Sequence, residues 1–466
     1  MPLVILWSAW TLKKNGNQMR KLAVLLSSAL LAACGSGSDG TGNPPTGSSA
    51  CTIDAQKQFV LDNLYYWYLW NDILPPGINI ASYASPEQLV FEVTRNFGPK
   101  NASDEPIDLF SSVGSLQADT EFFGEGKFEG FGFSWRFEDQ AQTDFRVTRT
   151  FLGSPADNGG LMRGDQILSL NTRTVADIVA NEGISAFFDA NDTVSFEVQP
   201  LSGNAFVSSI SKDIVTIDPV PQWRIIDAGN GRMVGYLELS QFISTANAEL
   251  DAAFAAFNTA SVSEIILDLR YNGGGLVSTA ELLGDYLGGF VAAGLVFSST
   301  EFNADRAANN GVTLFSDIAN RSANLSQLVV IASRGTASAS ELVTNGMIPH
   351  VNVAIVGDRT FGKPVGQIGL EFCDKILRPT AFRLANADGD GDYFDGLPVD
   401  CPAADDLSVA IGADSDPNMV AALGYLDTGA CPVVAAPGNQ QKPSPAYPQM
   451  MPEPNAPPER VILGAY

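Results

Sequence analysis

The sequence of 466 residues contains only one histidine, His350, and few basic residues. A metal site built from several histidines is therefore excluded, and a histidine-based catalytic triad has a single candidate base. Lys and Arg number 27 against 52 Asp and Glu, so the formal net charge is -25. Because this charge repels a phosphate backbone, we expect no nucleic-acid partner. With 45% hydrophobic residues the chain can bury a sizeable core, and its length suggests about three domains.

Long apolar runs are also scarce, and the clearest one lies near the amino terminus. Two basic residues follow Met19 and precede an apolar stretch of ten residues, 22–31, which is too short to span a bilayer stably. Small residues and then Cys34 follow, an arrangement that resembles a bacterial lipoprotein processing site. We therefore predict that residues 1–34 form a signal peptide with a lipobox cysteine. Lipidated Cys34 would anchor the protein to a membrane.

The sequence does not decide which of two methionines starts translation. A second, weaker apolar patch covers residues 2–12, so translation starts either at Met1 or, if that start is over-extended, at Met19. Gly35 follows the cysteine, which by resemblance to Gram-negative lipoproteins favours the outer membrane of a bacterial cell envelope, facing the periplasm. Residues 35–50 are rich in Gly, Ser and Pro and are expected to form a flexible tether.

Four cysteines remain once Cys34 is set aside, an even number in an oxidising compartment. This count predicts two disulfides, for which three connectivities are possible. We favour the pairs Cys373–Cys401 and Cys51–Cys431, because the second pair would tie the ends of the folded part together.

Residues 51–127 have the pattern of a helical N-terminal domain. Apolar residues between 59 and 68 recur at helical spacing until a pair of prolines stops the run. Ser85 then supplies an N-cap, followed by a proline at the first helical position and by Gln88 at the capping-box position, which starts a second helix. We interpret the aromatic run at 65–68 as core and interface, with a ligand platform as the alternative.

Residues 128–217 alternate short strand-like runs with turns. In the stretch 153–168 a serine caps a short helix, glycines end that helix, and a Gly-Asp turn leads into a strand. This pattern resembles a PDZ domain, in which backbone N–H groups of a loop bind a carboxylate and the next strand pairs with a peptide. The resemblance implies that a peptide's C-terminal carboxylate is bound at Gly130, Phe131, Gly132 and Phe133. The helix near 175–181 would form the other wall of the groove.

Between residues 218 and 431 strands alternate with helices. Strands are predicted at 234–239, 264–269, 328–332 and 353–356, and helices at 245–257, 277–286 and 338–347. This repetition predicts an α/β catalytic domain with a mostly parallel sheet covered by helices. Together with the helical N-terminal segment and the PDZ-like β domain, it makes the chain an α+β multidomain protein. The Pro-rich tail, residues 432–466, is expected to lack a core of its own.

Three segments at strand ends carry residues suited to catalysis. Residues 333–341 join a buried strand to a helix, where a serine hydroxyl is exposed and helix amides can stabilise an oxyanion. Spacing does not choose between Ser338 and Ser340, and a simple helix N-cap is the alternative. Residues 268–275 end in three glycines and lack the lysine of a P-loop, which favours an oxyanion hole over a nucleotide site. Lys363 follows a buried strand among small and apolar residues and is a candidate general base, with a surface lysine as the alternative.

These segments, with the PDZ-like domain upstream, resemble the C-terminal processing, or tail-specific, serine peptidase family over roughly residues 60–430. The resemblance is carried by Ser-Ala-Ser-Glu at 338–341, a lysine 25 positions after the first serine, a glutamine four positions later, and Asp-Leu-Arg-x-Asn-x-Gly-Gly. It implies that Ser338 is the nucleophile, Lys363 the general base and Gln367 the glutamine that orients the lysine. The amides of Gly274 and Ala339 would form the oxyanion hole. Some members place an aspartate where this chain has Pro349 and His350, so we do not expect an essential aspartate.

The function that the resemblance implies is acyl transfer without a cofactor or a metal. Neutral Lys363 would remove the proton of Ser338, which would attack a peptide carbonyl. We therefore hypothesise a serine endopeptidase of the cell envelope whose PDZ domain recognises the C-termini of its protein substrates. Two alternatives stay open: a catalytically silent PDZ adaptor lipoprotein that binds protein C-termini, and an esterase or other hydrolase on the same scaffold.

Two further features have weaker support. His350 follows the candidate helix and could pair with Ser338, but no motif surrounds it, and we interpret it as incidental. The acidic run at 386–395 imitates the first half of a calcium loop, but Leu397 stands where a bidentate glutamate belongs. We interpret this run as a solvated acidic turn, with weak calcium binding as the alternative.

Overall fold

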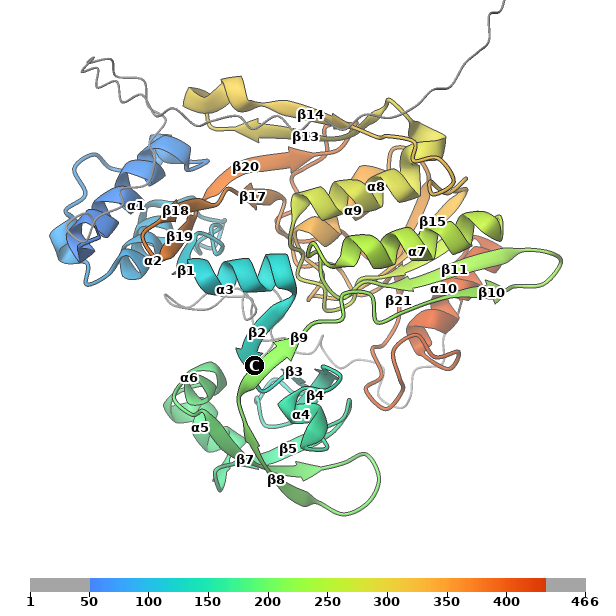
Figure 1. Cartoon of the computed structure of the whole chain (residues 1–466), viewed down its shortest axis with the longest axis horizontal. Helices are drawn as coiled ribbons and strands as arrows, with labels where there is room; N and C mark the ends of the chain where they lie inside the picture. Colours follow the sequence, from blue (N-terminus) through green and yellow to red (C-terminus); the bar gives the residue numbers. More distant parts are fainter. Residues whose placement is uncertain (1–50, 433–466) are drawn as a thin grey trace, which may run out of the picture. The chain divides into compact units, whose positions relative to one another are not determined.

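The computed structural model describes residues 51–432. The signal peptide, Cys34, the tether and the Pro-rich tail beyond Pro432 lie outside the described residues. A helical N-terminal region, a small β domain and an α/β domain follow one another along the described chain (Figure 1). None of the helices between residues 51 and 432 is long and apolar enough to cross a membrane.

The N-terminal region is helical, as predicted. Ser85 caps α2 by accepting a hydrogen bond from the amide of Gln88, and Pro86 occupies the first helical position. The core of this region includes residues of the aromatic run and its neighbourhood, Tyr65, Tyr68 and Trp70. The elements are α1 (Ile53–Trp67), α2 (Pro86–Phe97), β1 (Ser112–Ser115) and α3 (Leu116–Thr120).

The second segment is an antiparallel β domain with three short helices. Its sheet has the strand order β3-β4-β5-β7-β8 with β6 paired to β5, while β2 pairs separately with β9. Phenylalanines from β3, α6 and β7 pack edge to face in its core. The elements are β2 (Lys127–Gly130), β3 (Phe133–Phe137), β4 (Phe145–Thr150), α4 (Pro155–Asn158), β5 (Gln166–Leu170), β6 (Arg173–Thr174), α5 (Val175–Asn181), α6 (Ile184–Asp189), β7 (Thr193–Gln199), β8 (Phe206–Ser211) and β9 (Asp213–Thr216).

The third segment confirms the predicted parallel sheet covered by helices. Its strand order is β10-β11-β12-β15-β16-β21, and the strands from β11 to β21 run parallel, with β10 antiparallel at one edge. The elements are β10 (Gln222–Asp227), β11 (Met233–Glu238), α7 (Ala246–Thr259), β12 (Glu264–Asp268), α8 (Val277–Ala292), β13 (Val296–Phe302), β14 (Gly311–Leu314), β15 (Gln327–Ala332), α9 (Ala339–Met347), β16 (Asn352–Gly357), β17 (Val365–Gln367), β18 (Leu370–Phe372), β19 (Lys375–Arg378), β20 (Thr380–Ala385), β21 (Cys401–Pro402) and α10 (Pro417–Thr428).

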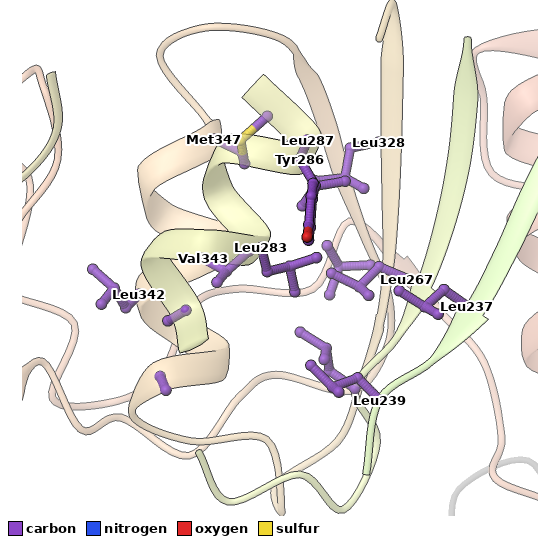
Figure 2. Packing of buried hydrophobic residues seen from close by; sticks show 14 of the residues in the cluster. Leu237, Leu239, Leu267, Leu283, Tyr286, Leu287, Leu328, Leu342, Val343 and Met347 are labelled. Carbon is purple, nitrogen blue, oxygen red and sulfur yellow. The ribbon is translucent and has the colours of Figure 1, made fainter. Parts of the chain in front are cut away.

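Both faces of the parallel sheet are buried. Successive side chains of a strand point to opposite faces, so Leu237 and Leu267 lie on the face covered by α7, α8 and α9. Figure 2 shows these leucines pointing toward Leu283 of α8. Tyr236 and Ile266 lie on the other face, in the cluster that α10 covers. This two-sided burial explains why the central strands read as continuous apolar runs.

Two smaller sheets, which the sequence pattern did not indicate, extend the α/β domain. One has the strand order β14-β13-β20-β17 and the other β1-β19-β18. In the second sheet, β1 of the N-terminal region pairs antiparallel with β19, with Ser112 opposite Arg378 (Figure 1). This pairing brings residues around 110 to the lysine-bearing part of the chain.

The two disulfides are Cys51–Cys373 and Cys401–Cys431. The predicted pairing was therefore wrong, although the predicted number holds. Cys51 precedes α1, and Cys373 lies in the turn after β18. The ring of Phe59 in α1 stacks on that of Phe372, the last residue of β18, with centroids 4.5 Å apart. The packing of α1 on this hairpin decides the pairing, and a cysteine count carries no information about that packing.

Replacing both Cys51 and Cys373 with serine is expected to lower the free energy of unfolding by about 2–5 kcal/mol. The bond joins residues 322 positions apart, so its loss frees a very large loop in the unfolded chain. Urea unfolding without reductant measures the change. The matched variant lacks Cys401 and Cys431, which are only 30 positions apart, and is expected to lose less stability. A larger loss in that variant would contradict the prediction.

Candidate active site

Ser338 lies where β15 leads into α9, at the N-cap position of that helix. Its φ of +56° is unusual for a residue with a side chain, and such strain is typical of functional positions. Ser340 is buried instead, and its hydroxyl donates a hydrogen bond of 2.8 Å to the carbonyl of Asn272. Of the two serines that spacing left open, Ser338 is the one that lines the cavity described below.

The glycine loop after β12 packs directly against this serine. A Cβ atom on Gly274, whose φ is +103°, would lie 2.8 Å from the Cβ of Ser338 and 2.9 Å from the amide nitrogen of Ala339, so glycine is required there. The Oδ1 of Asn272 accepts a hydrogen bond of 2.9 Å from the amide of Gly274. The amide of Gly274, which we predicted to be an oxyanion donor, already donates to Asn272. The amides of Gly273 and Ala339 have no hydrogen-bond acceptor among residues 51–432, so Gly273 replaces Gly274 as the candidate donor beside Ala339.

The carboxylate of Glu341 ties the serine to the lysine loop. Its Oε2 accepts hydrogen bonds from the amides of Ser338 at 2.9 Å and Lys363 at 2.8 Å. Its Oε1 accepts from the amide of Gly362 at 2.7 Å and the hydroxyl of Thr360 at 2.5 Å. Burial raises the pKa of Glu341, although these four hydrogen bonds act in the opposite direction. Glu341 is part of the motif at 338–341, but we assigned it no role from the sequence. These contacts show that it holds the serine loop and the lysine loop at a fixed distance.

Lys363 is largely enclosed by protein. Its Nζ donates a hydrogen bond of 2.8 Å to Oε1 of Gln367. The Nε2 of Gln367 donates to the carbonyls of Phe110 at 2.7 Å and Arg378 at 2.9 Å, which fixes the orientation of the amide. Burial lowers the pKa of Lys363 to about 8. A lysine with this pKa is partly neutral near neutral pH and can accept a proton.

Ser338 and Lys363 line one cavity of about 310 Å³. Within residues 51–432 the Nζ of Lys363 is hydrogen-bonded to Gln367 and not to Ser338. A direct contact is not required here, because catalytic hydrogen bonds often form only once a substrate is bound. The cavity thus brings together the predicted nucleophile, base and orienting glutamine.

The cavity walls are mostly apolar, with one ion pair. The apolar lining comprises Phe110, Phe123, Leu276, Val277, Ile376 and Phe382. Arg378 also lines the cavity and makes a two-fold hydrogen bond with the carboxylate of Asp119, at 2.6 and 2.7 Å. Sequence reasoning missed the N-terminal residues of this wall, because their proximity to the lysine depends on the β1–β19 pairing.

Two other predicted features lie apart from the cavity. Among residues 51–432, no three His, Cys, Asp or Glu side chains gather so that they could hold a metal ion. In the acidic run at 386–395, Asn386 closes a turn by accepting hydrogen bonds from two amides of the run. His350 does not line the cavity: its ring packs on Phe315, and its Nε2 lies 2.8 Å from the carbonyl oxygen of Val296.

The predicted peptide site in the β domain spans the junction of β2 and β3. Gly130 ends β2 and Phe133 begins β3, which lies at the edge of its sheet. The rings of Phe131 and Phe133 are buried against Phe188 of α6, with centroids 5.4 and 5.7 Å away. Val175 and Ile178 of α5, the 175–181 segment named from the sequence, belong to the same buried cluster.

The fold and the site define a PDZ-containing α/β protein with a serine and a lysine at one cavity. Three family models match the chain: "Peptidase S41 N-terminal domain" over residues 55–112, "PDZ domain" over 121–199, and "Peptidase family S41" over 233–400. The matched segments are therefore those of peptidase family S41, with a PDZ domain between them.

Known proteins of this type resemble the chain at moderate identity. A carboxyl-terminal-processing protease of Synechocystis is 29% identical over 58% of this chain and 61% of its own length. The carboxy-terminal processing protease CtpA of Bacillus subtilis is 25% identical over 63% of this chain and 60% of its own length. The match thus spans about three fifths of these relatives. A crystal structure of an S41-type protein from Bacteroides fragilis shares the fold, with a TM-score of 0.60 and 23% identity over 79% of this chain and 97% of that chain.

Proposed function

We propose that this protein is a serine endopeptidase of the C-terminal processing type, with Ser338 as nucleophile and Lys363 as general base. One observation carries the proposal: the serine and the lysine line the same cavity, and burial lowers the pKa of that lysine to about 8. The match to family S41 and the names of the related proteases support it.

The proposed reaction proceeds through an acyl-enzyme. As the Oγ of Ser338 bonds to the carbonyl carbon, neutral Lys363 takes the hydroxyl proton, and the amides of Gly273 and Ala339 hold the resulting oxyanion. The Oε1 of Gln367 accepts from Nζ and so orients the nitrogen lone pair. Lys363 then protonates the leaving amine as the C–N bond breaks, which leaves an ester on Ser338. Water, deprotonated by Lys363, attacks this ester; the bond to Oγ breaks, Lys363 returns the proton to Ser338, and the new carboxylate is released.

We also propose that the PDZ domain selects substrates by their C-termini and that these substrates are envelope proteins. The edge position of β3 supports the first part, because an extended peptide can add to such an edge as a further strand. The lipobox cysteine at Cys34, read from the sequence, supports the second part.

The test compares the purified full chain with its Ser338→Ala variant on an unstructured protein that ends in apolar residues. The substrate is supplied with a free or an amidated C-terminus. Cleavage that depends on Ser338 and weakens on amidation supports both the active site and the recognition of tails. If neither enzyme cleaves while the free tail still binds, the adaptor hypothesis is favoured instead.

The pH dependence of cleavage follows from the pKa of Lys363. Because burial lowers that pKa to about 8 and the neutral amine is the active form, kcat/KM is expected to rise with pH through an ionisation near 8 and then level off. Below that ionisation the rate falls about tenfold per pH unit. A pH profile measured with an uncharged short peptide tests this, and a flat profile from pH 6 to 9 would contradict it.

A further inference from the structure

A short segment of the N-terminal region, residues 108–111, lies directly against the general base. The Nζ of Lys363 lies 4.8 Å from the ring centroid of Phe110. The carbonyl of Phe110 accepts the hydrogen bond of 2.7 Å from Gln367, whose other end binds that Nζ. One residue from another part of the chain thus contacts both the lysine and the glutamine that orients it.

Phe110 is held in place by the buried carboxylate of Asp108. The Oδ1 of Asp108 accepts hydrogen bonds from the amides of Phe110 at 2.9 Å and Ser111 at 3.1 Å, and from the hydroxyl of Thr380 at 2.9 Å. Its Oδ2 accepts from the hydroxyl of Ser111 at 2.6 Å. Asp108 and Thr380 are fully buried, so this cluster is rigid and links the segment to β20.

The charged groups around Lys363 come from three parts of the chain. After burial, the largest influence on the pKa of Lys363 is the negative charge of Asp108, which raises it, and Glu341 at the start of α9 acts in the same direction. Arg378 at the end of β19 lowers that pKa, and its own charge is paired with Asp119. Asp108 is therefore the negative charge that acts most strongly on the base, and it also raises the pKa of Arg95 in α2.

We propose that Asp108 and Phe110 are positioning residues for the reaction, which complete the general base from the N-terminal region. Asp108 fixes the segment and balances the charge of Lys363, while Phe110 holds Gln367 through its carbonyl and excludes water with its ring. The inference rests on the proposed function, because it concerns the base of that reaction.

The test measures the acidic limb of the pH profile, which is the fall in activity at low pH as Lys363 becomes protonated. A purely structural role would not change the pH at which this fall occurs. Asp108→Asn keeps an oxygen acceptor at the same place and removes the negative charge. The neutral amine is then favoured, so the limb is expected to shift to lower pH by about one unit. Phe110→Ala keeps the backbone carbonyl but admits water to the amine. Because burial is the main cause of the low pKa, this limb is expected to shift to higher pH.

Thr380→Val is the matched control, because it removes one hydrogen bond of Asp108 without changing any charge. Its limb is expected to stay at the wild-type position, whatever happens to the plateau rate. Two readouts are used: kcat/KM for a peptide, and the rate at which a fluorophosphonate labels Ser338. If Asp108→Asn does not fold, the direction of the Phe110→Ala shift decides.

Opposite shifts in the two variants support the inference. Unmoved limbs, or limbs that move in the same direction, overturn it even when both variants lose activity. Wild-type protein that shows no Ser338-dependent cleavage or labelling at any pH would instead overturn the proposed function, and this inference with it.

Discussion

Replacing Lys363 with methionine is expected to lower kcat/KM by about 10³- to 10⁴-fold while the protein stays folded. Methionine keeps the unbranched stem that packs in the cavity wall and removes the amine that would take the proton of Ser338. The nearby buried carboxylates of Asp108 and Glu341 keep the amide and hydroxyl donors that satisfy them. Peptide hydrolysis near pH 9 measures the effect, because the wild-type lysine is mostly neutral there.

The matched control is Arg359→Met, which removes a basic side chain four residues earlier in the same loop. Arg359 is exposed and does not line the cavity, so activity is expected to stay within about twofold of wild type. Ser338→Ala sets the background rate. A Lys363→Met variant that keeps more than a tenth of the wild-type activity would exclude the lysine as the base.

Replacing Asp405 with alanine is expected to lower the free energy of unfolding by about 3–5 kcal/mol. Asp405 stands at the centre of an ion cluster that joins the PDZ domain to the peptidase domain. Its Oδ1 accepts from Arg163 at 2.6 Å and Arg270 at 3.3 Å, and its Oδ2 accepts from Arg136 and from the hydroxyl of Tyr271. The side chain of Asp405 is 11% exposed, and its removal leaves the guanidinium of Arg163, which is 14% exposed, without a carboxylate partner among residues 51–432. Arg136 and Arg270 lose one of their carboxylate partners and keep others.

This loss is expected to be the same at pH 5 and pH 8. Burial alone would raise the pKa of Asp405, but Arg163, Arg136 and Arg270 together hold it far below its usual range. A depressed carboxyl pKa stabilises the fold at every pH above the unfolded value of about 3.9, and the contribution is lost only as the pH falls toward the folded value. Thermal unfolding at the two pH values measures this, and a loss confined to one of them would contradict it.

The neighbouring Asp406 offers the control for this cluster. Its carboxylate accepts hydrogen bonds only from the amide and hydroxyl of Ser408 among residues 51–432, so Asp406→Ala is expected to cost about 1 kcal/mol or less. Equal losses for the two variants would show that the loop, rather than the charge of Asp405, supplies the stability. Because Tyr271 leads into the glycine loop, Asp405→Ala should also reduce kcat/KM at temperatures where the variant remains folded.

Local elements of the fold were readable from the sequence because their causes are local. The cap at Ser85 with Pro86 predicted the start of α2, and apolar runs at 264–269 and 328–332 predicted β12 and β15 to within a residue or two. Helix caps and strand periodicity act over a few neighbouring residues, so one stretch of sequence contains the information.

Pairings between distant segments were not readable. The antiparallel pairing of β1 with β19 and the bond between Cys51 and Cys373 depend on how α1 and α2 pack on the β18–β19 hairpin. Nothing in the local composition of residues 112–115 distinguishes this partner from others. The predicted disulfide pairing was wrong for the same reason, because spacing along the chain carries no information about distance in space.

The amino-acid sequence by itself determined the helical, PDZ and peptidase segments and supplied Ser338, Lys363 and Gln367 as candidate site residues, because these rest on motifs and periodicities of short range. Only the tertiary structure decided that Glu341 joins the serine and lysine loops and that Phe110 reaches the lysine from the N-terminal region. The depressed pKa of Lys363 belongs to the second group. Burial causes it, and the burying residues come from segments that meet only when the chain has folded.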